Sequence, residues 1–82
     1  MQRDYAAAQQ ALAAGDVDRA LSLFEQLSRA NPEIAEIHAT IGAIRFQQGD
    51  YPGALKELDQ AKRLKPAVPK LDGLIAMSQA EL

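Results

Sequence analysis

His38 is the only histidine in the chain and the only side chain suited to act as a general base near neutral pH. A catalytic histidine needs a nucleophile or a substrate proton within hydrogen-bond reach. The serines offer no such relation, because Ser22 and Ser28 fall in a different predicted helix and Ser78 falls in the C-terminal tail. We therefore interpret His38 as a partly buried histidine on a helix surface, and the sequence predicts no catalytic residue.

Other residue types that could carry chemistry are missing or scattered. The chain has no cysteine, and one histidine is too few for a zinc site built from imidazole ligands. The glycines form no phosphate-binding loop. Glu33 and Glu36 share the start of a predicted helix, where carboxylates offset the helix dipole. We expect no enzyme activity, no bound metal and no cofactor.

A group of basic residues in the C-terminal half could suggest a nucleic-acid surface: Lys56, Lys62, Arg63, Lys65 and Lys70. Acidic Glu57 and Asp59 interrupt the group, and no aromatic residues interleave with it for base stacking. The formal net charge of −2 gives no attraction to nucleic acid or to anionic membranes. No apolar run approaches the ~20 residues that span a bilayer. The sequence predicts a soluble protein, with the cytoplasm favoured, and neither a nucleic-acid partner nor membrane insertion.

The composition favours a small helical domain. Hydrophobic residues make up 48% of the 82 residues, and they are mostly Ala and Leu, which form helices readily. A chain of this length buries little more than about 60% of its unfolded surface, so its stability margin is narrow.

The positions of Gly and Pro reveal an internal repeat with a period of 34 residues. Seven identities recur at this spacing without a gap: Gly15 and Gly49, Asp16 and Asp50, Ala20 and Ala54, Leu21 and Leu55, Gln26 and Gln60, Arg29 and Arg63, Pro32 and Pro66. Gly and Pro end or turn helices, so each unit should be two helices joined at a turn.

The spacing of apolar residues agrees with two helices in each unit. The second unit places isoleucines at helical intervals between about Glu33 and Gln48, and a further apolar stripe follows Tyr51. We expect Gly49 to supply a left-handed helix end and Asp50 to cap the next helix. Arg45 should lay its methylene stem on the core and keep its guanidinium in water. The tail, with Pro69 near its start, predicts a last amphipathic helix, for a total of five.

These residues resemble the tetratricopeptide repeat family, whose unit has the same length. The first unit matches at Ala8, Gly15, Ala20, Phe24 and Pro32, and the second at Gly42, Gly49, Ala54, Leu58, Ala61 and Pro66. The resemblance implies an all-α, right-handed α-solenoid of antiparallel helix pairs that mediates protein–protein interaction. It also implies one domain over 1–82, with a first repeat at 1–34, a second at 35–68 and a capping helix at 69–82.

In the family, the first helix of each pair lines a concave groove. The resemblance places in this groove Gln2, Tyr5, Gln9, Leu12 and Ala13, then Glu36, Ala39, Ala43, Phe46 and Gln47, and from the tail Lys70, Gly73, Met77 and Ala80. Our candidate partner-binding residues are Tyr5, Gln9, Leu12, Ala39, Ala43, Phe46, Gln47 and Met77. The basic clamp of chaperone-binding members is absent at the corresponding positions. A floor of small residues suits an amphipathic helix or an extended apolar segment of a partner protein.

Two alternatives remain open at this stage. Tyr5 and Phe46 can equally serve to cover the core of a short array, and Met77 can fill a gap. Repeat arrays usually need about three units with polar caps, and the N-terminal face carries Leu23 and Leu27 without a predicted cap. The chain could therefore be a structural element that pairs with another copy through that face or belongs to a longer array.

Overall fold

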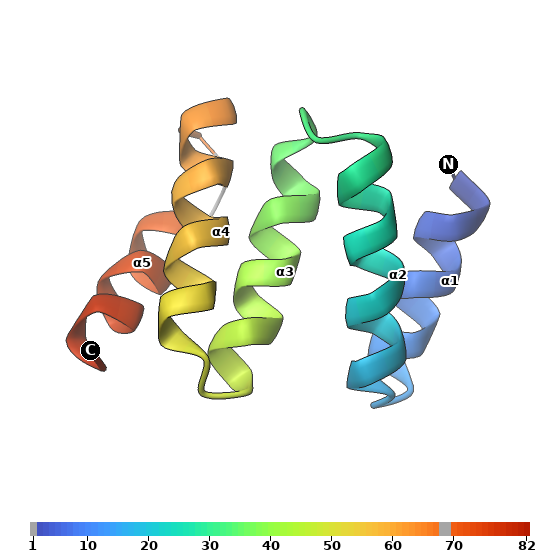
Figure 1. Cartoon of the computed structure of the whole chain (residues 1–82), viewed down its shortest axis with the longest axis horizontal. Coiled ribbons are helices and arrows are strands. Elements are labelled where there is room, and N and C mark those ends of the chain that lie inside the picture. Colours follow the sequence, from blue (N-terminus) through green and yellow to red (C-terminus); the bar gives the residue numbers. More distant parts are fainter. Residues whose placement is uncertain (1, 68–69) are drawn as a thin grey trace.

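The computed structural model describes residues 2–67 and 70–82, and these residues form five α-helices and no strand (Figure 1). In chain order the helices are α1 (Gln2–Ala13), α2 (Val17–Ala30), α3 (Ala35–Gln47), α4 (Tyr51–Leu64) and α5 (Leu71–Ala80). The predicted all-α fold is confirmed.

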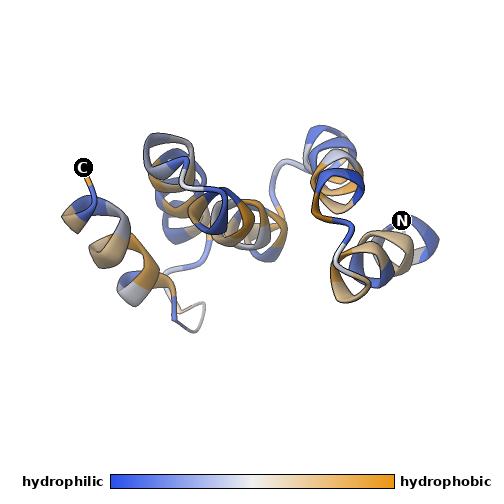
Figure 2. Ribbon diagram, turned by 90° about the horizontal axis from the view of Figure 1, so that it is seen from below, coloured by the Kyte–Doolittle hydropathy of each residue, from blue (hydrophilic) through white to orange (hydrophobic). Residues whose placement is uncertain are grey.

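The helices form antiparallel hairpins that stack side by side. α1 pairs with α2 and α3 with α4, while α3 also contacts α2 and α5. The stack measures 34 × 24 × 19 Å. Figure 2 shows α2 and α4 on one side of the stack and α1 and α5 on the other, with α3 between them. This arrangement is the predicted α-solenoid of antiparallel helix pairs.

The two glycine turns have the same construction. Gly15 and Gly49 adopt φ values of +82° and +81°, the left-handed region in which glycine carries no steric penalty. After each glycine an aspartate begins the next helix: Asp50 accepts a hydrogen bond from the Gly53 amide at 3.0 Å, and Asp16 accepts one from the Arg19 amide at 3.4 Å. The expected caps are present. The 34-residue period of the sequence therefore recurs in the backbone conformation of the two turns.

The start of α3 differs from the prediction. The helix begins at Ala35 and not near Glu33, because Ile34 has an extended backbone with φ −88° and ψ 105°. Ile34 packs its side chain on the core from this non-helical position. Glu33 therefore lies before the helix, while Glu36 lies in its first turn. Pro69, expected near the start of the last helix, lies outside the described residues.

In the described part of the chain, the buried apolar side chains form two clusters that meet at α3. One cluster joins α1, α2 and α3, and it consists of Ala8, Ala11, Ala20, Leu21, Phe24, Leu27, Ile37, Ile41 and Ile44. The other joins α3, α4 and α5, and it consists of Ala35, Ala54, Leu58, Ala61 and Leu71. Because α3 contributes to both, it is apolar around most of its circumference, as expected of a central helix.

α3 and α4 cross closely at Gly42. A Cβ atom at this position would lie 2.8 Å from Cγ and Cδ2 of Leu58 and 3.3 Å from the carbonyl oxygen of Ala54. Leu58 and Ala54 are fully buried, so neither can easily move away. The crossing therefore accommodates a hydrogen atom at residue 42 and little more.

We expect Gly42→Ala to lower the free energy of unfolding by about 0.5–2 kcal/mol. Over-packing against Leu58 should exceed the roughly 1 kcal/mol that alanine gains over glycine inside a helix. Urea denaturation followed by circular dichroism measures the change.

Gly73→Ala is the matched control, because a Cβ atom on Gly73 in α5 meets nothing within 4 Å. This variant should gain about 0.5–1 kcal/mol from helix propensity alone. Equal stabilisation of both variants would show that the crossing at Gly42 has room to spare.

Candidate functional site

The concave side of the stack contains an open hollow of about 560 Å³. It lies between the end of α1, the Gly15 turn, the length of α3 and the start of α5. The residues that line it are Leu12, Gly15, Val17, Ala39, Thr40, Ala43, Ile44, Gln47, Lys70 and Leu74. We call these residues the groove. Its lining is mainly apolar, and alanines occupy successive turns of α3, so a bound segment could approach the helix backbone closely.

Four of the predicted partner-binding residues lie together in the groove: Leu12, Ala39, Ala43 and Gln47. The sequence did not place in the groove five further residues that line it: Gly15, Val17, Thr40, Ile44 and Leu74. Gly15 and Val17 belong to a turn and to the second helix of the first pair, and no pattern in the sequence indicates how closely that turn approaches α3. The side chain of Gln2 lies outside the described part of the structure.

Tyr5 and Gln9 do not line the groove. The Tyr5 ring packs edge-on against Phe24 with 5.9 Å between ring centroids, and it covers the first core cluster. Gln9 lies one turn further along α1, where its Nε2 donates a hydrogen bond of 3.0 Å to the Tyr5 hydroxyl. These contacts favour the alternative in which Tyr5 closes the core.

Phe46 and Met77 also lie outside the groove. The Phe46 ring meets Tyr51 edge-on at 5.4 Å and packs on the second core cluster. Met77 is 48% exposed on α5. Phe46 therefore covers the core at the junction of α3 and α4, and Met77 is a surface residue.

The tail helix presents a different face from the one expected. Lys70 and Leu74 line the groove, whereas Gly73, Met77 and Ala80 do not. The reason is that α5 buries Leu71 and Ser78 against the stack. Leu74 follows Leu71 by three residues and precedes Ser78 by four, so it shares their side of the helix.

The buried side chain of His38 connects the two repeat units. Its side chain is 9% exposed, with Nδ1 at 2.9 Å from Glu57 Oε2 on α4. Its Nε2 lies 2.8 Å from the carbonyl oxygen of Pro32, in the loop after α2. Both ring nitrogens therefore lie within hydrogen-bond distance of an oxygen atom. The ring is more buried than expected, and its two nitrogens are occupied by structural contacts.

Arg45 connects the two repeat units through its guanidinium. Nη2 donates to Glu25 Oε1 of α2 at 3.2 Å, and Nη1 lies 3.9 Å from Asp50 Oδ2 in the second glycine turn. The Arg45 side chain is 32% exposed, and the sequence did not reveal that two carboxylates from separate segments meet beside its guanidinium.

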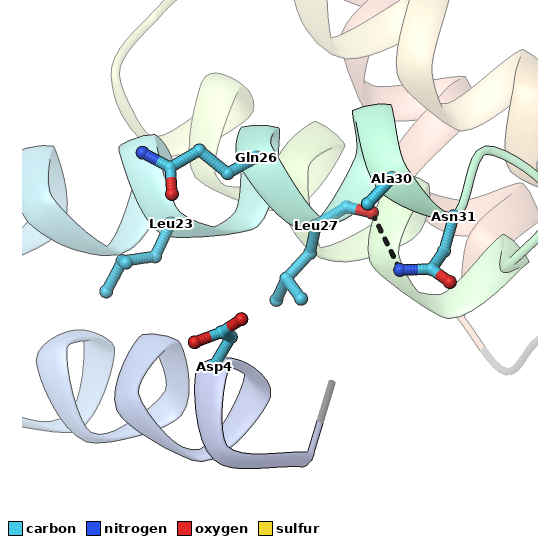
Figure 3. Close-up of a pocket in the computed structure, with 6 residues that line it drawn as sticks. All are labelled: Asp4, Leu23, Gln26, Leu27, Ala30 and Asn31. Carbon is cyan, nitrogen blue, oxygen red and sulfur yellow. Dashed lines mark hydrogen bonds between the residues drawn. The ribbon is translucent and has the colours of Figure 1, made fainter.

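A smaller hollow of about 320 Å³ lies at the N-terminal end of the stack. Figure 3 shows Asp4 of α1 facing Leu23 and Leu27 of α2 across it. Leu27 is 4% exposed, so it belongs to the core and not to the apolar face that the assembly alternative assigned to it. Leu23 is half-buried at the rim.

Two further properties of residues 2–67 and 70–82 bear on function. No three His, Asp or Glu side chains gather closely enough to hold a metal ion. None of the helices in this part of the chain has the length and apolar character required to cross a membrane.

Comparison with known families identifies the tetratricopeptide repeat. Its sequence model matches residues 5–69, which covers most of the chain, including nearly all of the first 34-residue unit and all of the second. Comparison with curated proteins gives no significant match.

We expect His38→Leu to lower the free energy of unfolding by about 1–3 kcal/mol, because the Pro32 carbonyl and the partly buried Glu57 carboxylate would both lose the imidazole as a polar partner. Urea denaturation measures the loss. Replacing Glu57 as well, in His38→Leu/Glu57→Leu, removes the unpaired carboxylate and should recover part of the stability. If the losses of unfolding free energy from the two substitutions are additive in the double variant, His38 and Glu57 do not interact.

Lys65 donates a hydrogen bond of 2.9 Å to Glu36 Oε2, and this bond, aided by the lysine's charge, lowers the pKa of Glu36. Any stability from the pair is present above the ordinary carboxyl pKa and is lost as pH falls through the lowered pKa of Glu36. Lys65→Ala should raise the pKa of Glu36 toward its ordinary value in an NMR titration. Lys56→Ala is the control and should leave the pKa of Glu36 unchanged. An unchanged pKa in both variants would rule out the pairing of Lys65 with Glu36.

Proposed function

Because the chain belongs to the tetratricopeptide repeat family, we propose that it is a protein-interaction adaptor that binds an apolar, helical segment of a partner protein in the groove. Protein–protein interaction is the role typical of the family. The groove itself is the observation that carries the specific proposal: an open, mainly apolar hollow of about 560 Å³ between α1, α3 and α5. The expectation of a cytoplasmic protein is part of this proposal.

The shape of the groove favours a helix as the occupant. Ala39 and Ala43 stand one turn apart on α3 and are half-buried, so part of each methyl group faces the hollow. Leu12 and Leu74 flank them from α1 and α5. A helix that places leucines at intervals of three and four residues can fit its side chains between these flanks. The same groove lacks any cluster of residues that would act on a bound substrate.

The proposal retains the division into a repeat at 1–34, a repeat at 35–68 and a capping segment at 69–82. Each hairpin falls within one unit, and α5 closes the end of the second core cluster through Leu71. In this role α5 has two functions: one side of the helix covers the core, and Leu74 flanks the groove.

We expect an amphipathic helical peptide of about 18 residues, or five turns, to bind the chain, whereas a scrambled peptide of equal composition should not. Fluorescence anisotropy gives the affinity, and NMR amide shifts should map the site to the groove. Ala43→Glu should weaken binding about tenfold or more, because a carboxylate would enter the apolar floor without a partner.

Ala76→Glu is the control, since Ala76 is exposed on α5 and does not line the groove. It should bind the peptide like the unaltered chain, and circular dichroism should show equal helicity for both variants. Equal binding by the two variants, or equal binding of the scrambled peptide, would refute the groove as the binding surface.

A second candidate function is assembly, either with another copy or within a longer array. It is favoured by the hollow of about 320 Å³ at the N-terminal end, where half-buried Leu23 lies at the rim (Figure 3). In the second unit the residues in register with Asp4 and Leu23 are His38 and Glu57, which are joined by a hydrogen bond. The first unit has no equivalent polar contact between that pair, because one member is a leucine.

Self-association predicts a mass in solution that rises with concentration, as measured by sedimentation. Leu23→Glu should then restore the monomer by placing a charge on the contact surface. A strict monomer across the accessible concentrations would eliminate pairing between copies and leave the adaptor as the proposed function.

A further inference from the structure

Lys70 is the only charged side chain among the residues that the structure shows lining the groove. The other polar side chains there are those of Thr40 and Gln47, and the Thr40 hydroxyl already donates to the Glu36 carbonyl at 2.9 Å. The groove therefore combines an apolar floor with one positive charge at the edge formed by α5.

No carboxylate within residues 2–67 and 70–82 neutralises this charge. The neighbouring lysines differ: Lys62 Nζ pairs with Asp72 at 2.9 Å and Lys65 Nζ pairs with Glu36 at 2.9 Å. Lys70 has no such ion pair in the described part of the structure. The lysine thus provides an uncompensated cation at an apolar surface, in a chain whose formal charge is −2.

The backbone at Lys70 is unusual as well. Among the described residues, Lys70 is the only one other than glycine with a positive φ, at +65°. This left-handed conformation costs a residue with a Cβ atom roughly 1–2 kcal/mol, and glycine avoids that cost. Strained backbone positions of this kind cluster at functional sites.

We propose that the partner helix carries a glutamate or aspartate side chain on the flank of its apolar face, and that this carboxylate pairs with the Lys70 ammonium. The inference rests on the proposed function and specifies the partner's chemistry. The partner and the groove are complementary in charge: leucines of the partner contact Leu12, Ala43 and Leu74, and the acidic side chain meets the one charged residue among the described lining residues.

The ion pair between Lys70 and the partner's carboxylate determines the register of the bound helix more than its affinity. Lys70 is exposed, so water screens the pair and its contribution is small. An apolar helix without a charged residue can slide by a turn along the alanine floor with little change in buried area. A carboxylate fixed against Lys70 selects one of these positions, which is how charged groups usually provide specificity.

The test uses three helical peptides with the same leucine stripe. One carries glutamate on the flank and one carries glutamine there; both are N-acetylated and C-amidated. The third carries glutamine and a free C-terminal carboxylate. Each is titrated into the full chain and into its Lys70→Gln and Lys70→Arg variants, with Lys56→Gln on α4 as the control. Fluorescence anisotropy at low and at high salt gives the affinities.

We expect Lys70→Gln to weaken the glutamate peptide about two- to fivefold, the range of exposed ion pairs, and to leave the glutamine peptide unchanged. Lys70→Arg and Lys56→Gln should preserve binding, and high salt should remove the difference between the peptides. Equal effects of Lys70→Gln on the glutamate and glutamine peptides would overturn the pairing while leaving the groove intact. Sensitivity confined to the free C-terminal carboxylate would overturn it too. Absence of binding by all peptides to the unaltered chain would overturn the proposed function as well.

Discussion

The close crossing of α3 and α4 at Gly42 is the contact on which the architecture depends. With no side chain at residue 42, the buried Leu58 and the backbone of Ala54 can lie directly against α3. The first pair uses the buried small residues Ala8 and Ala20 in register with Gly42 and Ala54. Close crossings hold the two helices of each hairpin near one another. Hairpins of this kind can stack so that α3 is enclosed on several sides. Larger side chains at these positions would separate the helices and open the core between the units.

The groove follows from that stacking. The first helix of each pair lies toward the concave side, and α5 follows the same pattern, so α1, α3 and α5 enclose an open space that no helix of the described chain fills. The surfaces left facing it are small or aliphatic, because Ile37 and Ile41 of α3 belong to the first core cluster and only Ile44 both joins that cluster and lines the groove. The same division of α3 into core and groove sides leaves Ala39 and Ala43 facing the groove.

Polar contacts link the repeat units in addition to the apolar core. His38 connects α3 with α4 and with the loop at Pro32, while Arg45 joins Glu25 of α2 to the turn at Asp50. The contacts with Pro32 and Glu25 join the second hairpin to the first unit, so these two limit how the hairpins can tilt against one another. Buried polar groups satisfied in this way add specificity to a packing that apolar contacts alone would leave less well defined.

The elements could be predicted from the residues alone: helices from Ala and Leu at helical intervals, turns from Gly15 and Gly49, caps from Asp16 and Asp50, and pairing from the 34-residue period. These features depend on local backbone preferences and spacing, which a linear pattern records. Packing between helices, in contrast, determines that Tyr5 and Phe46 close the core, that Leu74 and not Met77 faces the groove, and that Arg45 meets two carboxylates. Those outcomes depend on the rotation of each helix about its own axis, which is set by the neighbour against which it packs and not by the sequence around any one residue.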